Sequence, residues 1–172
     1  PTRRSSDLGY QGGVGALTTM GGARMGLSDA EMDDIKNDWR NANPNIVRLW
    51  GKLQKAAVEA IQTRNTVRVD CKPFIMFYMY GQHLVIRLPS GRELVYYSAG
   101  LERDDFGFRI TYYGMNQETK QWCKQDTYGG KLLENVTQAI ARDLLFNSML
   151  MLDSIGVPIV MHVHDEVVSE VP

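Results

Sequence analysis

The stretch KLLENVTQAIARDLLFNSMLMLDSIGVPIVMHVHDEVVSEV, residues 131–171, decides the fold. Its first half carries apolar residues at steps of three and four (Leu133, Val136, Ile140 and Leu144), which predicts a long helix over 131–153 with these side chains as its packed stripe. Glycine and proline at 156–158 end that helix. The apolar run after them predicts a buried strand over 159–163, a tight turn, and a return strand over 166–171.

Upstream of this stretch, the apolar residues recur with a period of two. The alternation is broken by Gly, Pro and Ser, which predicts short strands at 67–70, 74–79, 83–88, 93–97 and 106–112. Leu84, Ile86 and Leu88 share one face of such a strand. Short strands in sequence, followed by a long helix, indicate an α+β fold with an antiparallel sheet.

The first third of the chain is helical in pattern. Glycine-rich residues 8–26 favour a helix end that runs into turns. Ser28 and Glu31 have the spacing of a capping box and begin a helix that Pro44 should stop near Asn43. A second helix is expected over 44–64, with one apolar face and with Lys52, Lys55 and Arg64 on the solvent side.

The composition excludes several classes of protein. No apolar run approaches the ~20 residues that a membrane-spanning helix needs. The two cysteines are far apart, which excludes a disulfide framework and a zinc ribbon. The net charge is −1, so any DNA-binding function must rest on locally placed cations.

The turn His164-Asp165-Glu166 is the strongest chemical feature of the sequence. Adjacent carboxylates repel each other, and a hard divalent cation relieves the repulsion. Mg²⁺ prefers one or two carboxylates together with substrate phosphates, which points to phosphoryl transfer. A solvated hairpin tip explains the same residues without a metal. Zinc hydrolysis through His162 and His164 needs further histidine ligands, and the sequence has only one other histidine, His83.

The long helix offers a second clue, because Glu134, Gln138, Arg142 and Ser148 lie roughly along one side of it. Glutamine and arginine four residues apart can reach minor-groove acceptors and phosphates together. Polar helix faces also commonly meet only water.

Several segments, which follow one another in the family's order, resemble family A (DNA polymerase I-like) DNA polymerases of bacteriophage type. The segment YGGKLLENVTQAIARD (128–143) followed by VHDEV (163–167) is similar to the end of that family's palm. The segment LGYQGG (8–13) resembles the tail of motif B, and WRNANP (39–44) and LPSGR (88–92) resemble the segments between. The resemblance covers about residues 8–172.

The resemblance implies roles for matching residues. Asp165 matches the motif C aspartate that binds catalytic Mg²⁺, Glu166 matches its neighbour, and His164 matches a histidine at the primer terminus. Tyr10 resembles the motif B tyrosine at the nucleotide insertion site. The implied DNA contacts are Gln138, Arg142 and Arg92.

The resemblance also implies how the chain is organised. Residues 8–66 are expected to be the latter part of the helical fingers, and residues 67–172 the antiparallel-sheet palm of a right-hand polymerase, truncated at its C-terminus. Residues 1–7 resemble a translated sequencing adapter and are left out of the fold prediction. Motif A and the motif B arginine and lysine should precede Tyr10, and the lysine would fall at Thr2. Because motif A is missing, we expect the chain alone to be inactive.

The implied function is template-directed addition of dNMP to a primer 3′ end by a two-metal mechanism. Primer–template DNA, dNTPs and replication accessory proteins are the expected partners, in the cytoplasm of an infected bacterium. One alternative is a single-subunit RNA polymerase, in which serine usually follows the aspartate, so that Glu166 favours a DNA polymerase. Another is a non-catalytic viral protein that binds nucleic acid.

Overall fold

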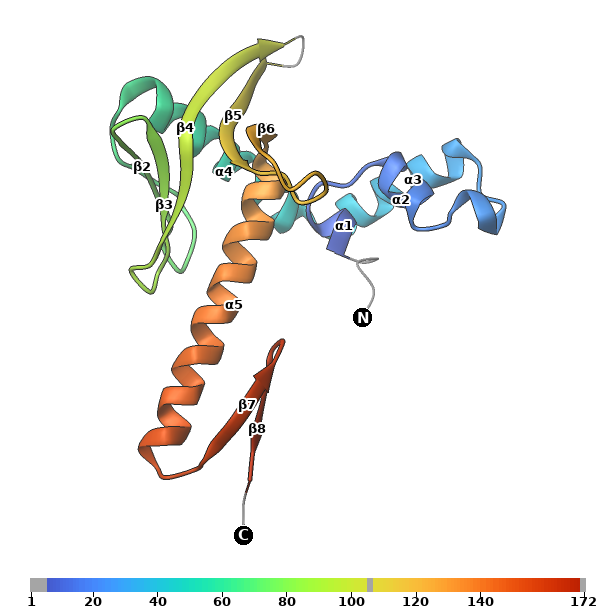
Figure 1. The fold of residues 1–172 in the computed structure, drawn as a ribbon. Helices are drawn as coiled ribbons and strands as arrows, with labels where there is room; N and C mark the ends of the chain where they lie inside the picture. Colours follow the sequence, from blue (N-terminus) through green and yellow to red (C-terminus); the bar gives the residue numbers. More distant parts are fainter. Residues whose placement is uncertain (1–5, 105–106, 171–172) are drawn as a thin grey trace.

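A computed structural model describes residues 6–104 and 107–170 (Figure 1). Three short helical segments come first, α1 (Ser6–Gly9), α2 (Val14–Thr19) and a 3₁₀ turn, η1 (Ala23–Met25), and two longer helices follow, α3 (Asp29–Ala42) and α4 (Pro44–Thr63). The capping box of α3 is confirmed: the Ser28 hydroxyl accepts from the Glu31 backbone N–H, and Glu31 accepts from the Ser28 N–H. Helix α3 ends before Asn43, as predicted.

The sheet is an antiparallel meander, and its six strands lie side by side in chain order. They are β1 (Val67–Arg68), β2 (Met76–Tyr80), β3 (His83–Arg87), β4 (Glu93–Asp104), β5 (Gly107–Met115) and β6 (Trp122–Thr127). The first five strands were predicted, although β4 is longer than expected and Phe106, the predicted start of the fifth, lies outside the described residues. Strand β6 was not foreseen.

The chain ends in a helix and a separate hairpin. Helix α5 (Gly129–Ser154) is followed by β7 (Ile159–Val163) and β8 (Glu166–Ser169), and the last predicted strand residue, Val171, lies outside the described residues. Figure 1 shows the N-terminal end of α5 under the sheet and the C-terminal half reaching away from it, with the hairpin folded back alongside. Gly156, with a φ of 77°, ends the helix where the sequence predicted.

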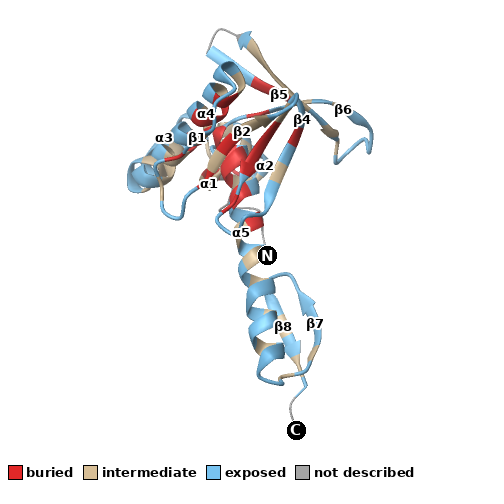
Figure 2. Cartoon of the chain, turned by 90° about the vertical axis from the view of Figure 1, so that its left-hand side faces the viewer, coloured by how far each residue is buried: buried red, intermediate tan, exposed pale blue. Residues whose placement is uncertain are grey.

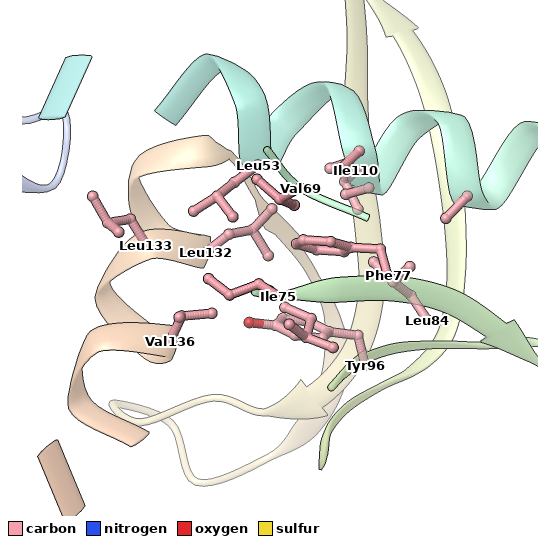
Figure 3. Close-up of a cluster of buried hydrophobic side chains, with 14 of the residues drawn as sticks. Leu53, Val69, Ile75, Phe77, Leu84, Tyr96, Ile110, Leu132, Leu133 and Val136 are labelled. Carbon is pink, nitrogen blue, oxygen red and sulfur yellow. The ribbon is translucent and has the colours of Figure 1, made fainter. Parts of the chain in front are cut away.

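The core lies between α4, one face of the sheet and the first half of α5 (Figure 3). Its side chains are almost wholly removed from water, and they include Leu53, Phe77, Leu84, Ile86, Ile110, Leu132 and Val136. The predicted faces of β3 and α4 are therefore the buried ones. Burial of these side chains contributes about 1.5–3 kcal/mol each relative to exposure.

The predicted apolar stripe of α5 is only half buried. Leu133 and Val136 lie in the core, but Leu144 is 63% exposed. Figure 2 shows the reason, because burial on α5 is confined to the end under the sheet. Helical periodicity marks which side chains share a face, but it does not say how far the covering layer extends.

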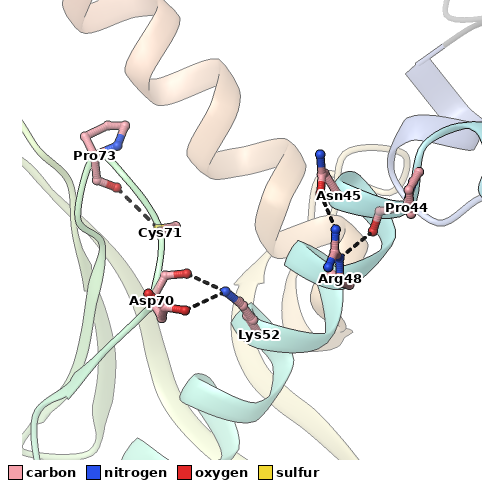
Figure 4. A network of polar contacts seen from close by, with 7 residues as sticks. All are labelled: Pro44, Asn45, Arg48, Lys52, Asp70, Cys71 and Pro73. Atoms are coloured by element: carbon pink, nitrogen blue, oxygen red, sulfur yellow. Dashed lines mark hydrogen bonds and ion pairs between the residues drawn. The ribbon is translucent and has the colours of Figure 1, made fainter.

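Helix α4 is tied to the start of the sheet by Lys52 (Figure 4). The Lys52 ammonium donates to the Asp70 carboxylate at 2.9 Å and to the Asp70 carbonyl oxygen at 2.6 Å. This hydrogen bond and ion pair lower the pKa of Asp70. Lys52 therefore has a protein partner and is not simply solvated as the sequence suggested.

Among the residues that the structure describes, no helix combines the length and the apolar character needed to cross a membrane.

Candidate nucleic-acid interface

The acidic turn lies at the tip of the β7–β8 hairpin, as predicted. Val163 pairs with Glu166, so His164 and Asp165 form the two-residue connection, and His164 has a φ of 55°. His164, Asp165 and Glu166 are all exposed. Two carboxylates and an imidazole thus stand at a tip that an incoming ligand can reach.

The expectation that the strand before the turn is buried is wrong. Val160 is 61% exposed, and Met161 and Val163 are exposed as well. The hairpin packs beside the C-terminal half of α5, where Phe146 meets His162 edge to face at 5.7 Å. A strand is buried only if other elements cover both of its faces, and along 159–163 the packing against α5 leaves most side chains exposed.

His162 therefore has a packing role, as a ring partner of Phe146. His83 is engaged elsewhere, since its Nδ1 accepts from the Ser98 backbone N–H at 3.0 Å. Within the described ranges, no group of three or more His, Cys, Asp or Glu side chains could hold a metal ion.

A groove of about 630 Å³ brings together the three residues expected to contact DNA. Arg92 comes from the turn before β4, and Gln138 and Arg142 come from α5. Asn135 and Tyr97 line the same groove and were not foreseen. Asn135 could have been found from its position three residues before Gln138, which places both side chains on neighbouring parts of one helix face.

Arg92 is held in place by the protein. Its Nε donates to Asp143 at 2.6 Å and its guanidinium also donates to the Ala139 carbonyl at 2.7 Å, while the Ser90 hydroxyl donates to the other Asp143 oxygen. Burial raises the pKa of Asp143, but the hydrogen bonds from Ser90 and Arg92 outweigh it, so the net pKa is lowered. Arg92 thus fixes the turn 88–92 against α5.

Arg142 lies on the side of α5 that carries the hairpin. Its guanidinium carbon lies 5.3 Å from the centre of the Phe146 ring, and Phe146 in turn contacts His162 of β7. Gln138 lies one turn earlier and donates to Glu134 at 3.3 Å. Helix α5 thus presents a polar row, Glu134–Gln138–Arg142, that leads toward the hairpin.

Tyr10 lies at the other end of α5. It packs against the main core, and burial, followed by the charge of Glu134, raises the pKa of its phenol. Its neighbour Gln11 accepts from the Gly130 backbone N–H at 3.0 Å. The hairpin runs beside the opposite, C-terminal half of α5 (Figure 1), so the described residues do not bring Tyr10 into contact with the acidic turn.

The chain is similar to a phage DNA polymerase. It is 43% identical over 166 residues to a protein named DNA polymerase from Bacillus phage SP02. The match covers 96% of this chain and 25% of that relative, so the chain spans about a quarter of the relative's length. No protein-family model matches the chain, and no solved structure matches it. The likeness to a DNA polymerase expected from the sequence is confirmed at this level.

Proposed function

We propose that the chain is part of a family A DNA polymerase, with residues 8–66 in the fingers and residues 67–172 in the palm. The identity to the SP02 protein over nearly the whole chain carries the proposal. The exposed HDE tip and the groove that joins Arg92, Gln138 and Arg142 support it. The substrates would be primer–template DNA and dNTPs, with accessory proteins of replication as partners in the host cytoplasm.

Asp165 and Glu166 fit Mg²⁺ in their chemistry. Both are exposed oxygen donors at one tip, and Mg²⁺ commonly binds one or two carboxylates and completes its shell with water and substrate phosphates. Bound there, the ion would stabilise negative charge on the oxygens of the transferring phosphoryl group. A second carboxylate donor, from motif A, is expected outside this chain.

The other candidate residues would bind and orient the DNA and the incoming nucleotide. Gln138 and Arg142 would contact the duplex from the minor-groove side and at its phosphates. His164, beside Asp165, would contact the primer terminus, and Tyr10 would check the incoming nucleotide. Arg92 would act through the turn that it fixes, which forms one wall of the groove.

Primer extension tests the assignment of Asp165. The protein is a chimera in which this chain replaces the aligned quarter of the SP02 protein. Asp165→Asn keeps the side-chain volume and removes a charged ligand, which should lower the extension rate about a thousandfold, since losing a metal ligand costs several kcal/mol of barrier. The matched control is Asp153→Asn, an exposed aspartate near the end of α5, which should extend normally.

The isolated chain is assayed beside the chimera with Mg²⁺ and all four dNTPs, and no extension is expected. Near-normal extension by the Asp165→Asn chimera would overturn the catalytic assignment. Extension by the isolated chain would overturn the requirement for motif A.

A further inference from the structure

Phe146 lies on the second half of α5, and its ring contacts two side chains at once. The guanidinium carbon of Arg142 lies 5.3 Å from the centre of the Phe146 ring. The His162 ring meets the same ring edge to face, with 5.7 Å between the two ring centres. Arg142 lines the groove described above, and His162 belongs to the hairpin that carries the acidic turn. One side chain therefore joins the groove to the hairpin.

The ring holds Arg142 without using its hydrogen-bond donors. Arg142 and Phe146 are four residues apart, so they are neighbours on one side of the helix. A guanidinium over an aromatic face is attracted by the π-electrons and keeps its N–H groups available. Within residues 6–104 and 107–170, the Arg142 side chain makes no ion pair and no hydrogen bond. Arg92, by contrast, already donates to Asp143 and to the Ala139 carbonyl oxygen. Of these two arginines, Arg142 is thus the one that can still donate to a ligand.

The same ring contacts the hairpin close to its tip. His162 pairs with Val167, and the next pair, Val163 with Glu166, closes the acidic turn. A contact at His162 therefore sets where the tip stands relative to α5. Phe146 is 38% exposed and does not belong to the core, so the packing of the sheet does not require an aromatic ring at this position.

We propose that Phe146 is a positioning residue that couples DNA binding in the groove to the placement of the acidic turn. The guanidinium of Arg142, the Phe146 ring and the His162 ring form one stack, so a duplex that binds Arg142 and a hairpin seated on the ring stabilise each other. The inference rests on the proposed function, because that function makes primer–template DNA the ligand of the groove. A ring that only anchors the hairpin would leave DNA binding unchanged.

Duplex binding by the chimera tests the contact with Arg142. It is measured in EDTA by the fluorescence anisotropy of a labelled primer–template, so that no metal ion enters the readout. Phe146→Leu keeps an apolar side chain and removes the ring, and it should weaken binding about threefold, the usual strength of an exposed cation–π contact. In an Arg142→Met background the same change should have no effect, because a positioning residue acts through the residue that it positions.

Two further variants serve as controls. Phe146→Tyr keeps the ring and should bind the duplex like the wild type. Leu144→Gln changes an exposed apolar side chain of the same half of α5, which is not among the described residues that line the groove, and it should also bind like the wild type. Circular dichroism melting checks that the variants fold, and Phe146→Met carries the same test if the leucine variant does not.

Hydrogen exchange of residues 159–163 tests the contact with the hairpin. The bound duplex should slow exchange there about threefold in the wild-type chimera, because the coupling between two sites is reciprocal. In the Phe146→Leu chimera, the duplex should leave exchange in this segment unchanged.

The inference is overturned if Phe146→Leu leaves duplex binding unchanged or weakens it equally in both backgrounds. It is also overturned if the duplex slows exchange in 159–163 equally with and without the ring, or if Leu144→Gln loses as much affinity as Phe146→Leu. A wild-type chimera that does not bind the duplex would contradict the proposed function and the inference with it. Normal duplex binding with any of the first outcomes would overturn the inference alone.

Discussion

Two glycines in the crossing of α4 and α5 have opposite surroundings. A Cβ at Gly129 would overlap the Trp50 carbonyl oxygen, which is backbone and cannot move aside, whereas a Cβ at the next residue of α4, Gly51, would meet open space. Gly129→Ala should therefore lower the free energy of unfolding by about 1–3 kcal/mol or more. Gly51→Ala should raise it by up to about 1 kcal/mol. Urea denaturation measures both, and equal effects would contradict the close approach at Gly129.

Tyr96 is a buried phenol whose ionisation opposes the folded state. Burial raises its pKa to about 12 from the ordinary 10.0, although the hydrogen bond from Asn135 works in the other direction. Because the folded pKa is the higher one, the stabilisation is complete below pH 10.0 and is lost as the pH rises toward 12.

The thermal midpoint of the wild type should thus fall more steeply above pH 10.0 than that of Tyr96→Phe. The control is Tyr113→Phe, at a half-exposed position on the outer side of β5, which should follow the wild type. If the thermal midpoints of all three proteins fell equally above pH 10.0, the Tyr96 phenol would be accessible to ionisation in the folded state.

At the scale of elements, the two halves of helix α5 have different surroundings. Its first half is buried through Leu132, Val136 and Ala139, whereas its second half contacts the turn 88–92 through Asp143 and packs beside the β7–β8 hairpin. An isolated two-stranded hairpin is marginally stable in water. Hydrogen exchange should therefore be fast in 159–169 and slow in 132–139, by at least a hundredfold. Equal protection of the two segments would show that the hairpin is held by more than α5.

At the scale of the whole molecule, many exposed apolar side chains lie outside the core, along the second half of α5 and on the hairpin. Leu144, Met151 and Ile155 continue the stripe of α5 past the end of the sheet and stay exposed, as do several side chains of the hairpin. Large exposed apolar patches bind hydrophobic dyes and promote association.

The isolated chain should accordingly bind anilinonaphthalene sulfonate and sediment as concentration-dependent oligomers. Met151→Gln combined with Ile155→Gln should reduce both signals and leave the thermal midpoint unchanged, because neither side chain belongs to the core. A wild-type chain that stays monomeric and does not bind the dye would contradict this.

Much of the fold could be predicted from short stretches of sequence. The capping box at Ser28, the end of α3 at Pro44, the end of α5 at Gly156 and the hairpin turn at His164 each depend on a few neighbouring residues. The sequence predicted all four, since caps, breakers and periodicity act over one or two turns of chain. Strand β6 was missed because its mostly polar residues, WCKQDT, become a strand through pairing with β5.

The sequence by itself determined the type of the major elements other than β6, the acidic tip at Asp165 and Glu166, and the likeness to a phage DNA polymerase. Only the tertiary structure decided which elements and side chains are neighbours. It joined Arg92 to α5 across some fifty residues of chain, left Leu144 and most side chains of β7 exposed, and left open space beside Gly51. The physical reason is that burial and convergence depend on which surfaces meet in space, and periodicity along one element carries no record of its neighbours.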